Sequence, residues 1–133
     1  MSIYRIDVKF PPFVSDYKAA LKKFRTFKSD LKAAFEILEN TPETGDQIPH
    51  TGSYIFKIRV GIKGQRIGRR GGFRLIYHVD SARQVITPLA LYFKPDTPNL
   101  SNAEIEDRIG RFSEYVKEDP DSVSSDAPPL TPD

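Results

Sequence analysis

The chain of 133 residues is long enough for one domain with its own core, and the absence of cysteine excludes disulfides and thiolate metal sites. Two isolated histidines have no metal-ligand spacing, no apolar run approaches the roughly eighteen residues that span a membrane, and the N-terminus has no signal pattern, so we expect a soluble cytoplasmic protein without metal or cofactor. The net charge of +2 hides an asymmetry: residues 118–133 hold five acids and no base, which leaves 20 bases against 13 acids, or +7, in residues 1–117. We predict a basic domain over residues 1–117 that meets an anionic partner, and a disordered, acidic, Pro/Ser-rich tail over residues 118–133.

The first fifty residues predict one strand and two helices. Residues 3–10 alternate apolar and polar side chains, which is typical of a half-buried strand, and Pro11 ends it. Ser15 is the expected N-cap of a first helix and Ser29 that of a second, each followed by an apolar stripe. Residues 40–52 are rich in Thr, Pro and Gly, so the chain turns there.

A basic hairpin follows this turn. Residues 54–60 and 72–80 each alternate apolar and polar side chains, which predicts two antiparallel strands joined by a Gly-rich loop. Because side chains two residues apart share a face of a sheet, we expect Lys57, Arg59 and Arg74 together on the face opposite the apolar set. This face is the candidate site. The stretch from residue 54 to residue 74 holds no acid and seven bases: Lys57, Arg59, Lys63, Arg66, Arg69, Arg70 and Arg74.

Residues 84–94 predict a third long strand. Its alternation places Tyr92 and Lys94 on the same face as Arg74, and Pro88, which cannot donate a ladder hydrogen bond, predicts a bulge or an edge. His78 in the preceding strand shares this face, where it is either a proton donor or, as is more common for a lone histidine, a structural residue.

Ser101 and Glu104 form the capping-box pattern at the start of a last helix. The predicted order is therefore strand, helix, helix, strand, strand, strand, helix. This order favours an α+β domain with helices packed on one face of a small, mainly antiparallel sheet.

Several segments in their order along the chain resemble one protein family. They are the helix Asp30–Leu38, the turn Thr41–Gly45, the strand Phe56–Arg59, the block Gly71–Tyr77 and the ending Leu91–Lys94. Together they resemble a RelE/ParE-superfamily toxin of type II toxin–antitoxin systems, in its HigB/RelE-like branch, over residues 3–117. The Lys-x-Arg strand followed by Gly-Gly-aromatic-Arg is the most specific combination.

The resemblance implies a RelE-like fold and a metal-independent endoribonuclease, an mRNA interferase, that cuts mRNA on the ribosome and so inhibits translation. It also implies a cognate antitoxin protein as partner. Lys57 and Arg59 match the basic strand pair of the family, and Arg74 matches the arginine after its Gly-aromatic step.

The match continues into the last strand and helix. Lys94 stands at the end of the last strand, but Pro95 occupies the place where the family has a further arginine. The active-site tyrosine of the family corresponds to either Tyr92 or Tyr115.

RNA cleavage without a metal needs a base for the 2′-hydroxyl, positive charge at the phosphate and an acid for the departing 5′ oxygen. A lysine loses its proton more readily when other cations are close, whereas arginine stays charged. Lys57 is therefore the candidate base, and Arg59 and Arg74 are the candidate phosphate clamps. Further RNA-binding candidates are Lys63, Arg66, Arg69, Arg70 and His78.

Other interpretations of the basic stretch remain open. A charged hairpin with a flexible tip needs no ligand, and residues 61–67 mimic the GxxG clamp of a KH domain, although the next glycines disfavour the helix that should follow. A ParE-like protein of nearly the same fold inhibits DNA gyrase by binding alone. A third alternative is a nucleic-acid-binding relative without catalysis.

Overall fold

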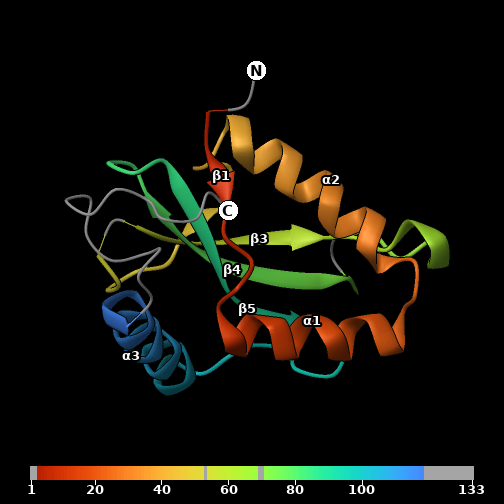
Figure 1. Ribbon diagram of the computed structural model, residues 1–133. Coiled ribbons are helices and arrows are strands. Elements are labelled where there is room, and N and C mark those ends of the chain that lie inside the picture. Colours follow the sequence, from red (N-terminus) through yellow and green to blue (C-terminus); the bar gives the residue numbers. More distant parts are fainter. Residues whose placement is uncertain (1–2, 53, 69–70, 119–133) are drawn as a thin grey trace. The chain divides into compact units, whose positions relative to one another are not determined.

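The computed structural model describes residues 3–52, 54–68 and 71–118, and the chain forms two compact units that divide between Asn99 and Leu100. The first unit holds a five-stranded sheet and two long helices, and the described part of the second unit is one helix (Figure 1). The α+β class predicted from the sequence is confirmed.

The sheet has the strand order β1-β5-β4-β3-β2. Its long strands are β3 (Ile55–Val60), β4 (Phe73–Asp80) and β5 (Val85–Phe93), and β4 pairs antiparallel with each of the other two. Its edges are two-residue strands: β1 (Arg5–Ile6) runs parallel to β5, and β2 (Asp46–Gln47) runs antiparallel to β3. The sheet is therefore mixed, with one parallel pair.

The other elements of the first unit include two helices and the 3-10 turn η1. Helices α1 (Pro11–Lys23) and α2 (Phe27–Asn40) lie between β1 and β2 in the chain, and η1 (Lys63–Gln65) lies between β3 and β4. Figure 1 shows that α1 ends, α2 begins and η1 lies at one end of the sheet. This end is where β3 stops and β4 starts.

Aromatic side chains from the turn between α1 and α2 pack on the first residue of β4. The ring centroids of Phe24 and Phe27 lie 6.1 Å and 4.2 Å from that of Phe73. Contacts of this kind between aromatic rings remove apolar surface from water. Phe73 is 2% exposed and Phe27 is completely buried. The apolar face of the sheet and the helices therefore share one core at this end.

Helix α1 also supplies a hydrogen-bond acceptor to the backbone of β5. Strand β1 pairs with the first two residues of β5, and no other strand of the described residues lies along the rest of that edge. The Asp16 carboxylate accepts a hydrogen bond from the backbone N–H of Leu91 at 2.9 Å. A helix carboxylate thus satisfies a strand donor that would otherwise be costly to bury.

The structure corrects four predictions for the first half of the chain. The strand expected over residues 3–10 is limited to β1, because Asp7 is buried and its carboxylate accepts the backbone N–H of Lys9 in a local turn. Ser15 is not an N-cap: α1 starts at Pro11, since proline suits a first helical turn that lacks an N–H partner. Ser29 is not one either, because α2 starts at Phe27 and the Ser29 hydroxyl donates back to the Thr26 carbonyl.

The fourth correction concerns the order of elements. The predicted order has a single strand after the two helices and before the central hairpin strand 72–80, whereas the structure has β2 as well as β3. Asp46 and Gln47 lie in a polar turn segment without strand periodicity, so only their pairing with Lys57 and Phe56 defines them as a strand. The irregularity predicted at Pro88 is confirmed: Tyr77 pairs with Pro88 while Ile76 pairs with Ala90.

Helix α3 (Asn102–Glu118) belongs to the second unit. Its capping box is confirmed, because the Glu104 carboxylate accepts the N–H of Ser101 at 3.0 Å and the Ser101 hydroxyl accepts the N–H of Glu104 at 3.1 Å. Most of the predicted tail 118–133 lies outside the described residues. None of the helices within the described ranges has the length and apolar character needed to cross a membrane.

Tyr77 of β4 fastens the turn before β2 to the sheet. Its side chain is fully buried, and its hydroxyl donates to the carbonyl of Pro42 at 2.8 Å and accepts the backbone N–H of Gly45 at 3.1 Å. A Cβ on Gly45 would lie 2.6 Å from the Lys57 carbonyl oxygen, so this close approach requires glycine. The turn 41–46 is therefore held in a fixed position beside Lys57.

Tyr77→Phe should lower the free energy of unfolding by about 2 kcal/mol, because it leaves the Pro42 carbonyl and the Gly45 N–H without their buried partner. Tyr54→Phe, at an exposed position, is the matched control and should leave stability unchanged. Urea denaturation of both variants measures the difference. Equal stability of Tyr77→Phe and wild type would contradict the role of this hydroxyl.

Wild-type stability should also fall at high pH. Burial raises the pKa of Tyr77 to about 12 from its ordinary value of 10.0, against a smaller opposing effect of the Gly45 hydrogen bond. A raised pKa means that folding favours the neutral phenol, so this contribution is complete below pH 10 and is lost as the pH rises through 12. Tyr77→Phe should lack this part of the pH dependence in denaturation series.

Candidate functional site

Three polar side chains lie in a row across the long strands. Arg59 of β3 is directly opposite Arg74 of β4, and Arg74 is directly opposite Tyr92 of β5. Lys57 pairs with Ile76, so it lies on the same face one pair further along β3. The structure therefore places Lys57, Arg59, Arg74 and Tyr92 together, as alternation predicts. We call Arg59, Arg74 and Tyr92 the arginine row.

The members of the row differ in exposure. Arg59 is exposed, whereas Arg74 is 5% exposed and Tyr92 is 8% exposed. The Arg74 guanidinium donates a hydrogen bond to the carbonyl of Phe73 at 3.3 Å, which orients it along its own strand. Arg59 is thus the member of the arginine row that is accessible to solvent.

Two like charges directly opposite each other are unfavourable in a sheet. Burial lowers the pKa of Arg74 from its ordinary value, the adjacent Arg59 lowers that pKa further, and Tyr92 has a smaller opposing effect. Arginine nevertheless stays charged at neutral pH, so the pair concentrates positive charge at one spot. Such a spot favours an anion with several oxygen atoms, of which a phosphate is the usual example.

Gly72 makes this strand pairing possible. A Cβ at residue 72 would collide with the carbonyl oxygen of Val60 and lie 3.0 Å from Cα of Gly61. Only glycine lets the start of β4 come this close to the end of β3, one pair away from Arg59 and Arg74. The second glycine of the Gly-Gly-aromatic-Arg block, Gly72, is therefore required by the close packing of β3 and β4.

Lys94 and His78 occupy different positions with respect to the row. Lys94 is exposed and directly follows β5. Its backbone N–H donates to the Gly72 carbonyl at 3.0 Å, which places Lys94 next to the arginine row. His78 pairs with Ile55 and Thr87, four residues or about 13 Å along β4 from Arg74. Burial lowers the pKa of His78, with a smaller opposing effect of Asp80, so the protein favours the neutral form of this imidazole.

The loop between β3 and β4 carries the other predicted RNA-binding cations. Lys63 and Arg66 are exposed in the loop, while Arg69 and Arg70 lie outside the described residues. The backbone N–H of Lys63 donates to the buried carboxylate of Asp30 in α2 at 3.3 Å. The loop is therefore attached to the helical layer and does not extend the arginine row.

A second contact holds the same loop. A Cβ on Gly64 would lie 2.5 Å from the Thr26 hydroxyl oxygen, so the loop backbone packs directly against the residue before α2. Sequence reasoning missed both Asp30 and Thr26 as partners of the loop. The available signal was Asp30 itself, the single acid among the six bases of residues 18–32.

Among the described residues, no three His, Cys, Asp or Glu side chains gather in an arrangement that could hold a metal ion. No protein-family model matches the chain, and no curated protein sequence matches it.

Arg59→Gln should raise the free energy of unfolding by about 0.5 kcal/mol, because it removes one of two like charges that face each other across β3 and β4. The gain should shrink in high salt, which screens the repulsion in the wild type. Thermal denaturation at low and high ionic strength measures both effects. A loss of stability at low salt would show that Arg59 supports the fold.

Gly72→Ala should destabilise the protein by about 1–3 kcal/mol, since its methyl group would force β3 and β4 apart next to the arginine row. Gly68→Ala is the matched control, because nothing lies within 4 Å of the Cβ position there. Denaturation midpoints compare the two variants. Equal midpoints would contradict the close approach at Gly72.

Proposed function

We propose that the protein is a metal-independent endoribonuclease that cleaves mRNA on the ribosome, and that it acts as the toxin of a toxin–antitoxin pair with a cognate antitoxin as partner. The observation that carries the proposal is the arginine row, flanked by Lys57 and Lys94. Two opposed arginines, a lysine and a tyrosine on one sheet face provide the groups that metal-free RNA cleavage requires.

Each group has a role that its chemistry allows. Lys57 takes the proton of the 2′-hydroxyl, whose oxygen forms a bond to the adjacent phosphorus while the bond from phosphorus to the 5′ oxygen breaks. Arg59 and Arg74 hold the phosphate oxygens as negative charge builds up on them. Tyr92, the hydroxyl donor of the row, gives a proton to the departing 5′ oxygen. The products are a 2′,3′-cyclic phosphate and a 5′-hydroxyl end.

The exposure of the row adds one requirement. Arg59 is exposed and contacts the incoming phosphate first, whereas Arg74 at 5% exposure reaches it only after the surface above it opens. Binding energy from the rest of the RNA is then used to bring Arg74 into contact. Cleavage would in this way depend on a long substrate more than on a dinucleotide.

The order of elements supports the RelE-like part of the proposal. Apart from the additional β2 and η1, the order β1, α1, α2, β3, β4, β5, α3 agrees with the order predicted from the sequence. The mixed sheet with β1 beside β5 brings the N-terminal strand next to the last strand. This partial agreement supports the carry-over of Lys57, Arg59 and Arg74.

The arginine row also bears on the ParE-like alternative. A protein that inhibits gyrase by docking alone gains most from apolar and aromatic contact surface. Opposed arginines on one face concentrate positive charge and hydrogen-bond donors, which suit a ligand with phosphates. We therefore favour the nuclease hypothesis over the gyrase-inhibitor hypothesis.

The proposal is tested in a translating extract with a reporter mRNA and EDTA-treated protein. Arg74→Ala should lower the rate of mRNA cleavage about a hundredfold, because it removes one charge from the phosphate clamp. Arg74→Lys should recover part of the rate, and Arg111→Ala, an exposed arginine of α3, is the control that should cut normally. Cleaved ends are mapped by primer extension.

Two results would overturn the proposal. Cleavage by Arg74→Ala at the wild-type rate would remove the arginine row from the mechanism. Intact mRNA with wild-type protein, together with inhibition of purified gyrase in a supercoiling assay, would establish the ParE-like alternative.

A further inference from the structure

A second cationic surface lies on the helical layer. Residues 18–32 contain six bases and one acid, and all six bases are exposed whereas the acid, Asp30, is buried. The six bases are Lys18, Lys22, Lys23, Arg25, Lys28 and Lys32. Lys23 is already engaged, because its ammonium lies 3.0 Å from the Asp96 carboxylate and over the Phe93 ring. The others extend the basic character of the protein beyond the hairpin.

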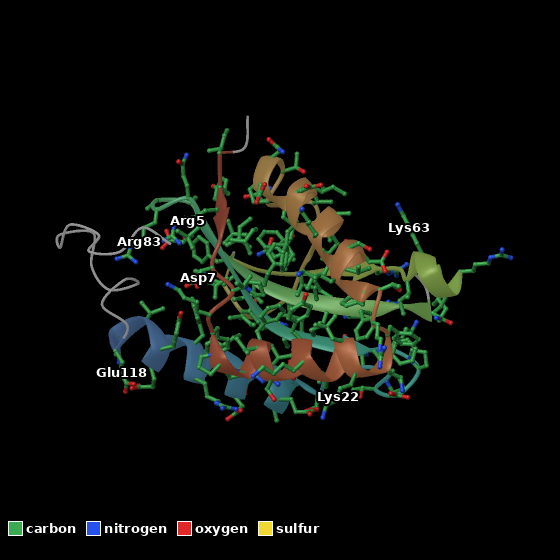
Figure 2. All side chains as sticks on the ribbon, turned by 45° about the vertical axis from the view of Figure 1, so that its right-hand side comes forward. Arg5, Asp7, Lys22, Lys63, Arg83 and Glu118 are labelled. Carbon is green, nitrogen blue, oxygen red and sulfur yellow. The ribbon has the colours of Figure 1, made fainter. Side chains whose placement is uncertain are left out.

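The loop between β3 and β4 joins this surface. The Lys63 N–H bonds to Asp30, and Gly64 packs against Thr26, so the loop lies against the beginning of α2. Figure 2 shows the Lys63 side chain extending outward from the loop, and the Lys22 side chain extending from α1 in the opposite direction. We define the end patch as Arg25, Lys28, Lys63 and Arg66, the cations nearest the contact between the loop and α2. Within the described part of the chain, none of these four forms an ion pair.

The end patch and the arginine row lie at the same end of the sheet. Phe24 and Phe27, which flank Arg25, pack on Phe73 at the start of β4. Phe73 is the residue immediately before Arg74, and its side chain points to the opposite face of the sheet. A strand of RNA that meets both cationic regions therefore passes around this end of the sheet, from the helical face to the face of the arginine row.

The chemistry of the end patch indicates its ligand. Exposed large hydrophobic side chains occur at Ile3, Val8, Ile37 and Tyr54, and none of these is within residues 18–32 or 61–68. Protein interfaces have apolar or aromatic centres, whereas contacts to a phosphate backbone need only spaced cations and donors. Charge without apolar surface favours a nucleic-acid backbone over an acidic protein segment.

The end patch is also preformed. Asp30 and Thr26 hold the loop backbone, and Lys28 follows in the first turn of α2, so Lys63 and Lys28 are carried by elements in direct contact. Less conformational entropy is lost when a ligand binds cations whose backbone is already fixed. This distinguishes the end patch from a mobile charged hairpin tip.

We propose that the end patch is a docking site for the phosphate backbone of RNA, independent of base sequence, that holds the strand whose scissile phosphate reaches the arginine row. The choice of RNA as the polyanion rests on the proposed function. Docking at the end patch supplies binding energy at a distance from the reacting phosphate. It should therefore raise kcat/KM for a long RNA, because part of that binding energy brings Arg74 into contact with the phosphate.

The test uses the full chain and a fluorescent single-stranded RNA of mixed sequence. The patch variant is Arg25→Gln/Lys28→Gln/Lys63→Gln, and the control Arg5→Gln/Lys9→Gln/Arg83→Gln removes the same charge from the N-terminal segment and from the turn before β5. Anisotropy titrations across salt concentrations should give a weaker affinity for the patch variant. Its slope of log K against log salt should be shallower by about 2, since each lost contact to a single strand removes about 0.7.

The outcomes separate the docking site from the proposed function. Equal losses for patch and control variants, or loss of binding only to polyglutamate or to vesicles of phosphatidylglycerol, would overturn the docking site. Patch-dependent RNA binding without any cleavage would overturn the nuclease and leave the docking site standing. Cleavage of a long RNA with an unchanged kcat/KM in the patch variant would overturn the docking site and leave the nuclease standing. The single variants Arg25→Gln and Lys63→Gln, each expected to change the slope by about 0.7, repeat the test with less perturbation of the fold.

Discussion

The pairing of β3 with β4 sets the properties of the candidate site, because it places Arg59 directly opposite Arg74. Nothing in the local preferences of either strand favours this arrangement, since like charges opposed in a sheet repel each other and Arg74 is also buried. The pairing is maintained by the apolar side chains on the other face, where Phe73 packs against Phe24 and Phe27, and by the close approach of Gly72 to β3. The fold thus offsets an unfavourable electrostatic contact with burial of aromatic surface.

The same core connects the sheet to the helical layer and to the loop that follows β3. The turn between α1 and α2 contributes Phe24 and Phe27 to the core and presents Arg25 and Lys28 to solvent. Asp30 is buried beside this turn and binds the loop backbone, so one acid among many bases has a structural role and leaves the surface around it positive. Charge at this end of the molecule is consequently built from three chain segments. It forms one surface only because the loop is attached to α2.

The sequence predicted the α+β class, the three long strands, their alternation and the shared face of Lys57, Arg59, Arg74 and Tyr92, because alternation at a period of two is a strong local signal. The start of α1 was missed because Ser15 resembles a cap, whereas Pro11 already fits a first helical turn. Strand β2 and the contact from Asp30 to Lys63 depend on pairing between segments distant in the chain, which no local pattern contains. The burial of Arg74 is likewise a tertiary property. Alternation along a strand predicts the face of the sheet on which a side chain lies, but it does not predict which other parts of the chain cover that face.

The central claim is that Arg59 and Arg74 act on one and the same phosphate. A double-mutant cycle of Arg59→Ala and Arg74→Ala, measured as kcat/KM for RNA cleavage, tests this claim most directly. If both side chains hold the same phosphate, the two losses should deviate from additivity by about 0.5–3 kcal/mol. Additive losses would mean that the two arginines act on separate groups, and unchanged kcat/KM in both single variants would contradict the assignment of this face as the site.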